Sequence, residues 1–176
     1  MSTYFFTADL HLSHSNIIKY CHRPFANVDE MDETLIANWN ATVSAHDTVF
    51  HIGDFCMGDF RKHIDRLNGI KIFLKGSHDR GLEKAGIAKH DIYMLSARQT
   101  GVVDIVMCHY AMRVWSKSHY NTWHLYGHSH GHLAPEGKSW DVGVDSNGFR
   151  PLSLAEIEVI MSKRPDNFNL VREKSQ

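Results

Sequence analysis

Short apolar strand candidates alternate with helical patterns through the first half of the chain, and this alternation is what most restricts the possible folds. Three runs of aromatic and β-branched residues predict buried strands, at residues 4–7, 48–52 and 70–74. Helical patterns lie between or beside them, at residues 16–20, 29–43 and 60–67. This β-α-α-β-α-β order favours a sheet of parallel strands covered by helices.

The second half of the chain has further strand candidates and few residues for helices between them. These candidates lie at residues 92–95, 102–108, 123–126 and 140–144. Ser153 and Glu156 form a capping box before an apolar run, which predicts a helix over residues 153–163. Two β-rich halves flanked by helices indicate an α/β sandwich with two sheets. We expect the last ten or so residues, which are polar, to fray.

Length and composition limit the class of protein. At 176 residues and 43% hydrophobic, the chain predicts a single domain over residues 1–176. The net charge of −1 predicts no extended nucleic-acid surface. Three cysteines without C-x-x-C pairing favour reduced thiols and a cytoplasmic location. No stretch approaches the ~18 apolar residues that span a bilayer, so we expect no membrane partner. The sequence leaves the oligomeric state open.

Polar residues gather where the predicted strands end. In chain order these ends are followed by Asp9-Leu10-His11, Gly53-Asp54, Gly76-Ser77-His78-Asp79, Cys108-His109 and Gly127-His128-Ser129-His130. Ligands of α/β sheets bind beyond the carboxyl ends of the strands. We therefore expect these five loops to meet on one rim.

The residue types on this rim predict a metal site. Aspartate and histidine are the usual ligands of borderline divalent metals, and the chain has 14 histidines. Asp9 with His11, and His128 with His130, are two residues apart, which places both side chains on one side of an extended backbone. Together with Asp54 and His109 they make six candidate ligands, at the upper end of the roughly four to six that one ion accepts, which favours two ions.

Each of these motifs alone is more often a solvated turn than a site. The prediction depends on five weak signals that occur in order, all at predicted strand ends. The remaining histidines of note are expected on the surface or in packing roles: His22, His46, His63, His90, His119 and His124.

The ordered set resembles the calcineurin-like metallophosphoesterase family, whose blocks run Asp-x-His, Gly-Asp, Gly-Asn-His-Asp/Glu, His and Gly-His-x-His. The resemblance covers about residues 7–130. It implies a four-layer α-β-β-α sandwich with two mixed β-sheets, and two divalent ions, with manganese expected first and iron, nickel or zinc as alternatives. The ligands it implies are Asp9, His11 and His130 for the first ion, His109 and His128 for the second, and Asp54 as a bridge.

The sequence departs from the family pattern at Ser77, where the family has an asparagine that binds the second ion. A serine hydroxyl is a shorter and weaker ligand than an amide carbonyl. The resemblance therefore predicts a looser second site at Ser77, or impaired turnover.

Two further roles follow from the resemblance. His78 would protonate the departing group, hydrogen-bonded to Asp79, while the two ions activate water and hold the phosphate for in-line attack. Short segments around residues 9–18, 23–25 and 142–145 also resemble small bacterial and phage-type members. The residues expected to line a substrate pocket are His14, Arg23, Tyr110 and Arg113, although both arginines could instead pair with carboxylates.

A phosphodiester of nucleotide type is the substrate we expect, by analogy with the family. A phosphomonoester is the nearest alternative. A metal-binding regulatory protein without turnover is a second alternative, which Ser77 supports. A mononuclear zinc hydrolase is a third, and it predicts one ion per chain.

Overall fold

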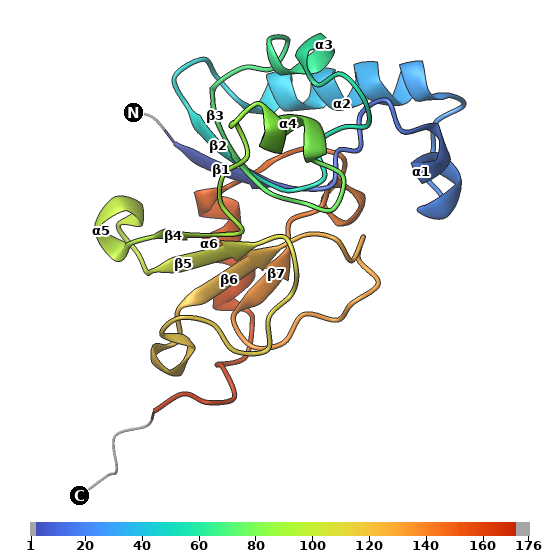
Figure 1. Ribbon diagram of the computed structural model, residues 1–176. Helices are drawn as coiled ribbons and strands as arrows, with labels where there is room; N and C mark the ends of the chain where they lie inside the picture. The colour runs from blue at the N-terminus through green and yellow to red at the C-terminus, as the bar shows by residue number, and fades with distance from the viewer. Residues whose placement is uncertain (1–2, 172–176) are drawn as a thin grey trace, which may run out of the picture.

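The structure is a computed structural model that describes residues 3–171. Two four-stranded sheets face each other, with helices packed around them (Figure 1). The fraying expected at the end of the chain falls in part on residues 172–176, outside the described range. Within that range, no helix has the length and apolar character needed to cross a bilayer.

The first sheet is built mainly from the first half of the chain. Its strands occur in the order β3 (Ile70–Leu74), β2 (Thr48–Ile52), β1 (Tyr4–Thr7) and β8 (Leu152–Ser153). The first three are parallel, and β8 pairs antiparallel with β1. The parallel strands bring the ends of β1, β2 and β3 to the same edge, as the sequence predicted.

The second sheet comes from the second half of the chain. Its strands occur in the order β4 (Ile92–Leu95), β5 (Ile105–Cys108), β6 (Trp123–Tyr126) and β7 (Ser139–Asp141). Only β4 runs antiparallel to its neighbour. The prediction of an α/β sandwich with two mixed sheets is therefore confirmed.

Helices cover the outer face of the first sheet. They are α1 (Ser15–Tyr20), α2 (Val28–Thr42), α3 (Arg61–Ile64) and α4 (Arg80–Lys84). The longest, α2, begins where the Asn27 side chain accepts a hydrogen bond from the Glu30 amide. Its buried face packs on the first sheet in one apolar cluster and includes Met31, Leu35 and Trp39. The short α4 and α5 (Ala97–Thr100) were not predicted from the sequence.

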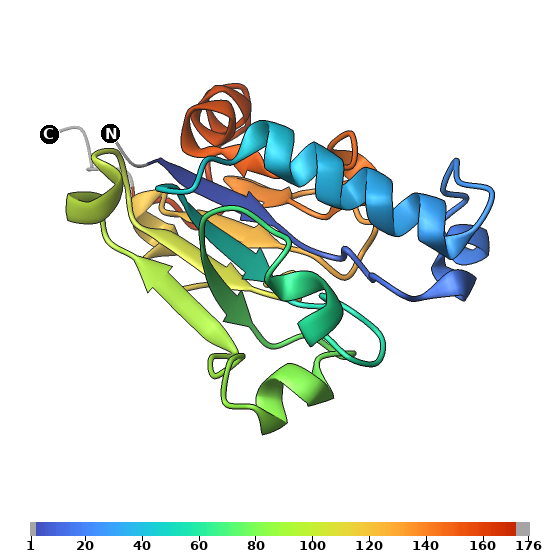
Figure 2. The same ribbon diagram turned by 90° about the horizontal axis from the view of Figure 1, so that it is seen from above.

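A second apolar cluster lies between the sheets. Phe6 and Phe50 of the first sheet meet Met107 and Leu125 of the second, all fully buried. Helix α6 (Leu154–Ser162) packs into the same cluster, and Figure 2 shows it end-on at one side of the sandwich. The capping box of Ser153 and Glu156 starts this helix as predicted.

The outermost layer beside the second sheet differs from the expected four-layer order. Residues 110–122 cover this face, with a short 3-10 turn at Ser118–Tyr120 in place of a long helix. Within this cover the Met112 amide donates to His124 Nε2, and the Trp115 ring packs 5.3 Å from the His124 ring. The order is therefore helix, sheet, sheet and loop, because no amphipathic helical segment follows β5 to form the fourth layer.

Candidate metal centre

The backbone itself brings the first two candidate loops together. Beyond β1 and β2 the parallel pairing continues in irregular form, since the amide of Asp9 donates to Gly53 O and the amide of His11 donates to Asp54 O. Because these bonds connect the two loops residue by residue, they place the Asp9, His11 and Asp54 side chains at one edge of the sheet.

Most candidate ligands have a left-handed backbone. The φ angles are 58° at Asp9, 51° at His11, 59° at Asp54, 66° at His128 and 47° at His130. Such angles are uncommon for residues other than glycine and cluster at functional sites. The extended-backbone argument for the two-residue spacing was therefore wrong. The paired side chains do converge, but through tight turns rather than through strand alternation.

One set of ligand atoms comes from Asp9, His11 and His130. These atoms all lie within 4.8 Å of one another. The His130 Nδ1–H donates to Asp145 Oδ2 at 2.7 Å, which leaves Nε2 free to act as a ligand. Asp9 uses Oδ2 to accept the His128 amide at 2.8 Å, and its Oδ1 has no partner among the described residues.

A second set comes from Asp54, His109 and His128, again with ligand atoms within 4.8 Å of one another. The His109 Nδ1–H donates to Ile52 O at 2.9 Å, so Nε2 is the free nitrogen. That nitrogen lies 3.3 Å from Asp54 Oδ2. Each set therefore has one histidine whose orientation is fixed by a hydrogen bond outside the site.

Asp54 lies between the two sets. Its Oδ2 is 3.5 Å from His11 Nε2 on one side and 3.3 Å from His109 Nε2 on the other. A further set of ligand atoms within 4.8 Å joins Asp54 to His11 and His78. Among the candidate ligands, Asp54 therefore has the position that a bridging carboxylate requires.

Buried polar atoms at this centre fit divalent cations. Asp9 Oδ1, both nitrogens of His11 and Nε2 of His109 are buried without a hydrogen-bond partner among the described residues. Burial raises the pKa of Asp9 to about 7 and lowers the pKa of His11 to about 3. The protein thus excludes water from these groups without supplying partners, and bound cations would supply them.

Asp79 has a role other than the one expected. Its carboxylate is buried and accepts the amides of Asp54 at 2.7 Å, Phe55 at 2.9 Å and Gly76 at 2.9 Å. No hydrogen bond from His78 reaches it among the described contacts. The expectation that Asp79 orients the His78 ring is therefore wrong. Asp79 instead ties the loop after β2 to the loop after β3, and so positions Asp54.

Ser77 and His78 both contact the Asp54 carboxylate. The Ser77 hydroxyl donates to Asp54 Oδ2 at 3.0 Å, and the His78 amide donates to Oδ1 at 2.8 Å. The His78 side chain is exposed, and its ring centroid lies 5.2 Å from that of His11. Its imidazole is therefore accessible to solvent at the edge of the candidate centre.

Two of the predicted substrate residues lie at the centre. His14 caps α1, where its Nδ1 accepts the Ile17 amide at 3.0 Å, and its ring is 5.8 Å from that of His78. Tyr110 is half exposed, and its ring centroid lies 4.9 Å from that of His109 and 4.8 Å from that of His128.

Arg23 is not available to a substrate, so its predicted role is wrong. It is 4% exposed, and its guanidinium donates to both carboxylate oxygens of Asp145, at 2.7 and 2.8 Å. It also donates to the carbonyls of Asp9 and Leu10. The structure thus makes Arg23 a buried support of the first loop, which is the alternative carboxylate pairing.

Arg113 also pairs with a carboxylate. Its Nη1 donates to Glu136 at 2.9 Å, and both side chains are 70% exposed. The pair lies on the segments that follow His109 and His130, and neither residue belongs to the ligand sets.

Asp145 is the main residue of the candidate centre for which the sequence predicted no role. It receives both His130 and Arg23, and its ligand oxygen also lies within 4.8 Å of the Cys21 sulfur and a His130 nitrogen. The segment Val142–Asp145 had been singled out by resemblance, but nothing in it specified the partners of the carboxylate. Gly127 permits a close approach of the two loops, since an added Cβ there would lie 2.7 Å from Asp9 Oδ2.

Three histidines outside the centre are also buried: His51, His63 and His124. His124 donates to Val106 O and accepts the Met112 amide, in agreement with the predicted packing role. His63 lies against Ser13 Oγ at 2.8 Å, and the Ser13 amide donates to both oxygens of Asp32. This cluster holds Ser13 in the turn between His11 and His14.

The chain has relatives in an archaeon and in phages. It is 31% identical over 175 residues to the uncharacterized protein MJ1445 of Methanocaldococcus jannaschii, with 93% of each chain covered. Over 86 residues it is 35% and 34% identical to the gene 66 proteins of Mycobacterium phages L5 and D29, covering 45% and 46% of this chain and 41% and 42% of those proteins. No family model matches the chain.

A solved structure shares the fold. The protein of unknown function AQ665 from Aquifex aeolicus has a TM-score of 0.66 and covers 91% of this chain and 100% of its own, at 22% identity. At that identity the likeness concerns the fold alone.

Proposed function

The chain belongs to the same family as the uncharacterized protein MJ1445, and we propose that it is a cytoplasmic, dinuclear metal-dependent phosphoesterase of the calcineurin-like type. Its preferred substrates are phosphodiesters of nucleotide type. The observation that supports this most is the position of Asp54, whose Oδ2 lies within 3.5 Å of a nitrogen from each of two ligand sets. A bridging carboxylate between two histidine-rich sets is the arrangement that holds a pair of ions.

The residues divide into two proposed ion sites. Asp9, His11 and His130 would hold the first ion and His109 and His128 the second, and Asp54 lies where it would contribute to both sites. When bound, such a pair of ions supplies an activated water and positive charge for the phosphate oxygens. Manganese is the first choice, with iron, nickel and zinc as alternatives, since these ligands accept all four.

The protein itself supplies a proton and orientation. The exposed His78 imidazole gives a proton to the leaving oxygen, which gains charge as its bond to phosphorus breaks. His14, whose Nδ1 accepts the Ile17 amide, carries its own proton on Nε2 and so faces the substrate as a donor. Tyr110, packed on His109 and His128, forms the opposite wall.

The His78 role has a kinetic test. General acid assistance contributes about 10²–10⁴-fold, and least where the leaving group is already acidic. His78→Ala should therefore reduce the hydrolysis of a nucleoside ester far more than that of an activated aryl ester. Equal losses on both substrates would argue against the acid role.

One observation favours a second candidate, a metal-binding regulatory protein without turnover. Ser77 Oγ donates to Asp54 Oδ2, so it occupies a lone pair of the bridging carboxylate rather than adding a ligand. A phosphomonoesterase is the nearest alternative within the enzyme class.

Elemental analysis and an assay with bis-p-nitrophenyl phosphate and added Mn²⁺ test the proposal together. We expect two ions per chain and metal-dependent turnover, both lost in Asp54→Asn. Asp91→Asn is the matched control, because that carboxylate is exposed and pairs only with Lys75 among the described residues. Two ions without turnover would favour the regulatory protein, and one ion per chain would favour a mononuclear hydrolase.

A further inference from the structure

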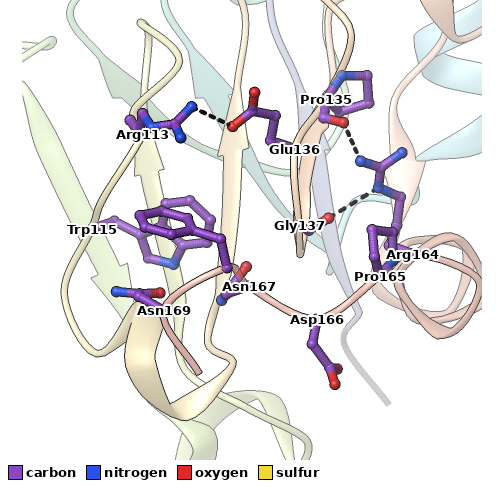
Figure 3. A pocket seen from close by; sticks show the side chains of 11 residues that line it. Arg113, Trp115, Pro135, Glu136, Gly137, Arg164, Pro165, Asp166, Asn167 and Asn169 are labelled. Atoms are coloured by element: carbon purple, nitrogen blue, oxygen red, sulfur yellow. Dashed lines mark hydrogen bonds and ion pairs between the residues drawn. The ribbon is translucent and has the colours of Figure 1, made fainter. Parts of the chain in front are cut away.

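A groove crosses the outer face of the second sheet beside the candidate metal centre. One cavity of about 340 Å³ is lined by Arg113, Trp115, Pro135 and Phe168 among others. Figure 3 shows Arg113, Trp115 and Pro135 around it. A neighbouring cavity of about 200 Å³ is lined by Met112, Tyr126 and Leu133 among others. Both cavities include Arg113 and Glu136, so this ion pair separates two parts of one groove.

An aromatic ring and a cation form a platform at the far end of the groove. Phe168 is 65% exposed, and the Arg113 guanidinium carbon lies 5.0 Å from its ring centroid. Trp115 lines the same cavity with its indole fixed, because Nε1 donates to Thr122 O at 3.1 Å. Exposed aromatic faces beside arginine are the usual stacking surfaces for nucleobases.

The rest of the groove is preformed. The Arg164 guanidinium donates to the carbonyls of Pro135 and Gly137 (Figure 3), and the Asn167 amide nitrogen donates to Ser118 O and Thr122 O. The Arg113–Glu136 pair differs from these contacts because both side chains are 70% exposed, and an exposed ion pair opens at little cost.

The groove starts within reach of the candidate metal centre. Tyr110 packs on the imidazoles of His109 and His128, and Ala111 is the next residue along the chain and lines the nearer cavity. Arg113 lies three positions after Tyr110, a span of at most ~11 Å between their Cα atoms. A substrate of two or three nucleotides could therefore touch both.

Charge limits what the groove can recognise. Arg113 and Arg164 are balanced by Glu136 and Asp166 in the same cavity, and Arg164 is already bonded to carbonyls. A groove with almost no net charge does not attract a chain of phosphates strongly, but it can bind an uncharged base.

We propose that this groove is a nucleobase subsite, in which a base next to the scissile phosphodiester stacks on Phe168 and Arg113. The proposal rests on the proposed phosphodiesterase function for its role in catalysis, but not for binding. It assigns the substrate class as a dinucleotide or short single-stranded oligonucleotide rather than a lone phosphate ester.

Binding of adenosine to the protein in EDTA tests the subsite without any turnover. The probe is the indole N–H signal of Trp115 in a nitrogen-proton correlation spectrum, identified among the chain's four tryptophans by Trp115→Phe. We expect adenosine to shift this signal, Phe168→Ala to weaken binding about tenfold, and Phe168→Tyr to retain it. Tyr120→Ala is the control, since Tyr120 is 66% exposed and does not line the groove. A Trp115 signal unmoved by adenosine, or equal binding by folded Phe168→Ala, would overturn the proposal.

Kinetics then separate the subsite from the chemistry. Phe168→Ala should raise KM for a dinucleoside monophosphate about tenfold, and leave kcat/KM for the base-free ester methyl p-nitrophenyl phosphate unchanged. Binding of adenosine without hydrolysis of either ester would sink the phosphodiesterase proposal and leave the subsite standing. Hydrolysis of both esters with no adenosine binding would overturn the subsite and leave the phosphodiesterase proposal standing.

Discussion

Replacing Arg23 by methionine should destabilise the protein strongly. The arginine side chain is fully buried and pairs with Asp145 through two hydrogen bonds, of 2.7 and 2.8 Å. Removing one partner of a buried pair costs about 3–5 kcal/mol, because the other charge stays buried without compensation. The carbonyls of Asp9 and Leu10 lose a donor in the same variant, so we expect the upper half of that range.

Urea unfolding in EDTA measures this effect free of metal binding. A loss of about 4 kcal/mol corresponds to a fall in Tm of roughly 10 °C for a chain of this length. Arg23→Lys should recover only part of the loss, because one ammonium cannot meet the carboxylate and both carbonyls together. Arg23→Met combined with Asp145→Leu should be more stable than Arg23→Met alone, since no charge is then left unpaired.

The result that would refute this reasoning is equally definite. If Arg23 instead bound the substrate, Arg23→Met would leave the free energy of unfolding unchanged and would raise KM. Additive losses in the double variant would show that the two side chains do not act as a pair.

Three further predictions concern the centre and one helix. Ser77→Asn should tighten the second metal site and raise turnover, and a metal titration that matches the wild type would count against a ligand role at this position. Gly76→Ala should lower metal content to about one ion or none, because an added Cβ would overlap the Asp54 amide and carboxylate. The hydrogen bond from Arg150 lowers the pKa of Glu156 to about 2. The stability difference between wild type and Glu156→Gln should therefore be constant above about pH 5 and shrink as pH falls from about 4.5 towards 2 in urea titrations; a difference that persists at pH 2 would contradict this.

The sequence predicted the position of the site better than its geometry. Polar residues at the ends of β1, β2, β3, β5 and β6 do meet at one rim, because parallel strands bring their carboxyl ends together. The left-handed turns at Asp9 and His128 could not be predicted, since neither residue type requires a positive φ. The residues of these motifs do come together, but through left-handed turns rather than through the extended backbone that their two-residue spacing suggested.

Contacts between residues that are distant in sequence were the other part of the candidate site that could not be predicted. Arg23 and Asp145 are 122 residues apart, and no local pattern links them. The resemblance implied that Asp79 pairs with His78, whereas the fold turns the carboxylate onto three backbone amides. The loop that covers the second sheet could not be predicted for a related reason. Trp115 packs on the His124 ring, but no helical spacing of apolar residues in this segment indicates that it lies against the sheet.

The unusual backbone at the centre and its buried supports are two parts of one arrangement. Each left-handed turn costs about 1 kcal/mol or more, and five candidate ligands have one. Such conformations persist only where the surrounding structure fixes them. Asp79 does so for the Asp54 loop through three amides, and Arg23 does so for the Asp9 loop through two carbonyls.

Neither support offers an atom to a metal or a substrate, yet both are charged groups buried at a cost. A fold that needed only stability would gain more from apolar side chains at these positions. Under the proposed function, their presence is explained by the need to hold the candidate ligands in place before a cation binds. The proposed metal centre would then be preorganised, and we expect changes at Arg23 or Asp79 to reduce its affinity for Mn²⁺ although neither residue is a candidate ligand.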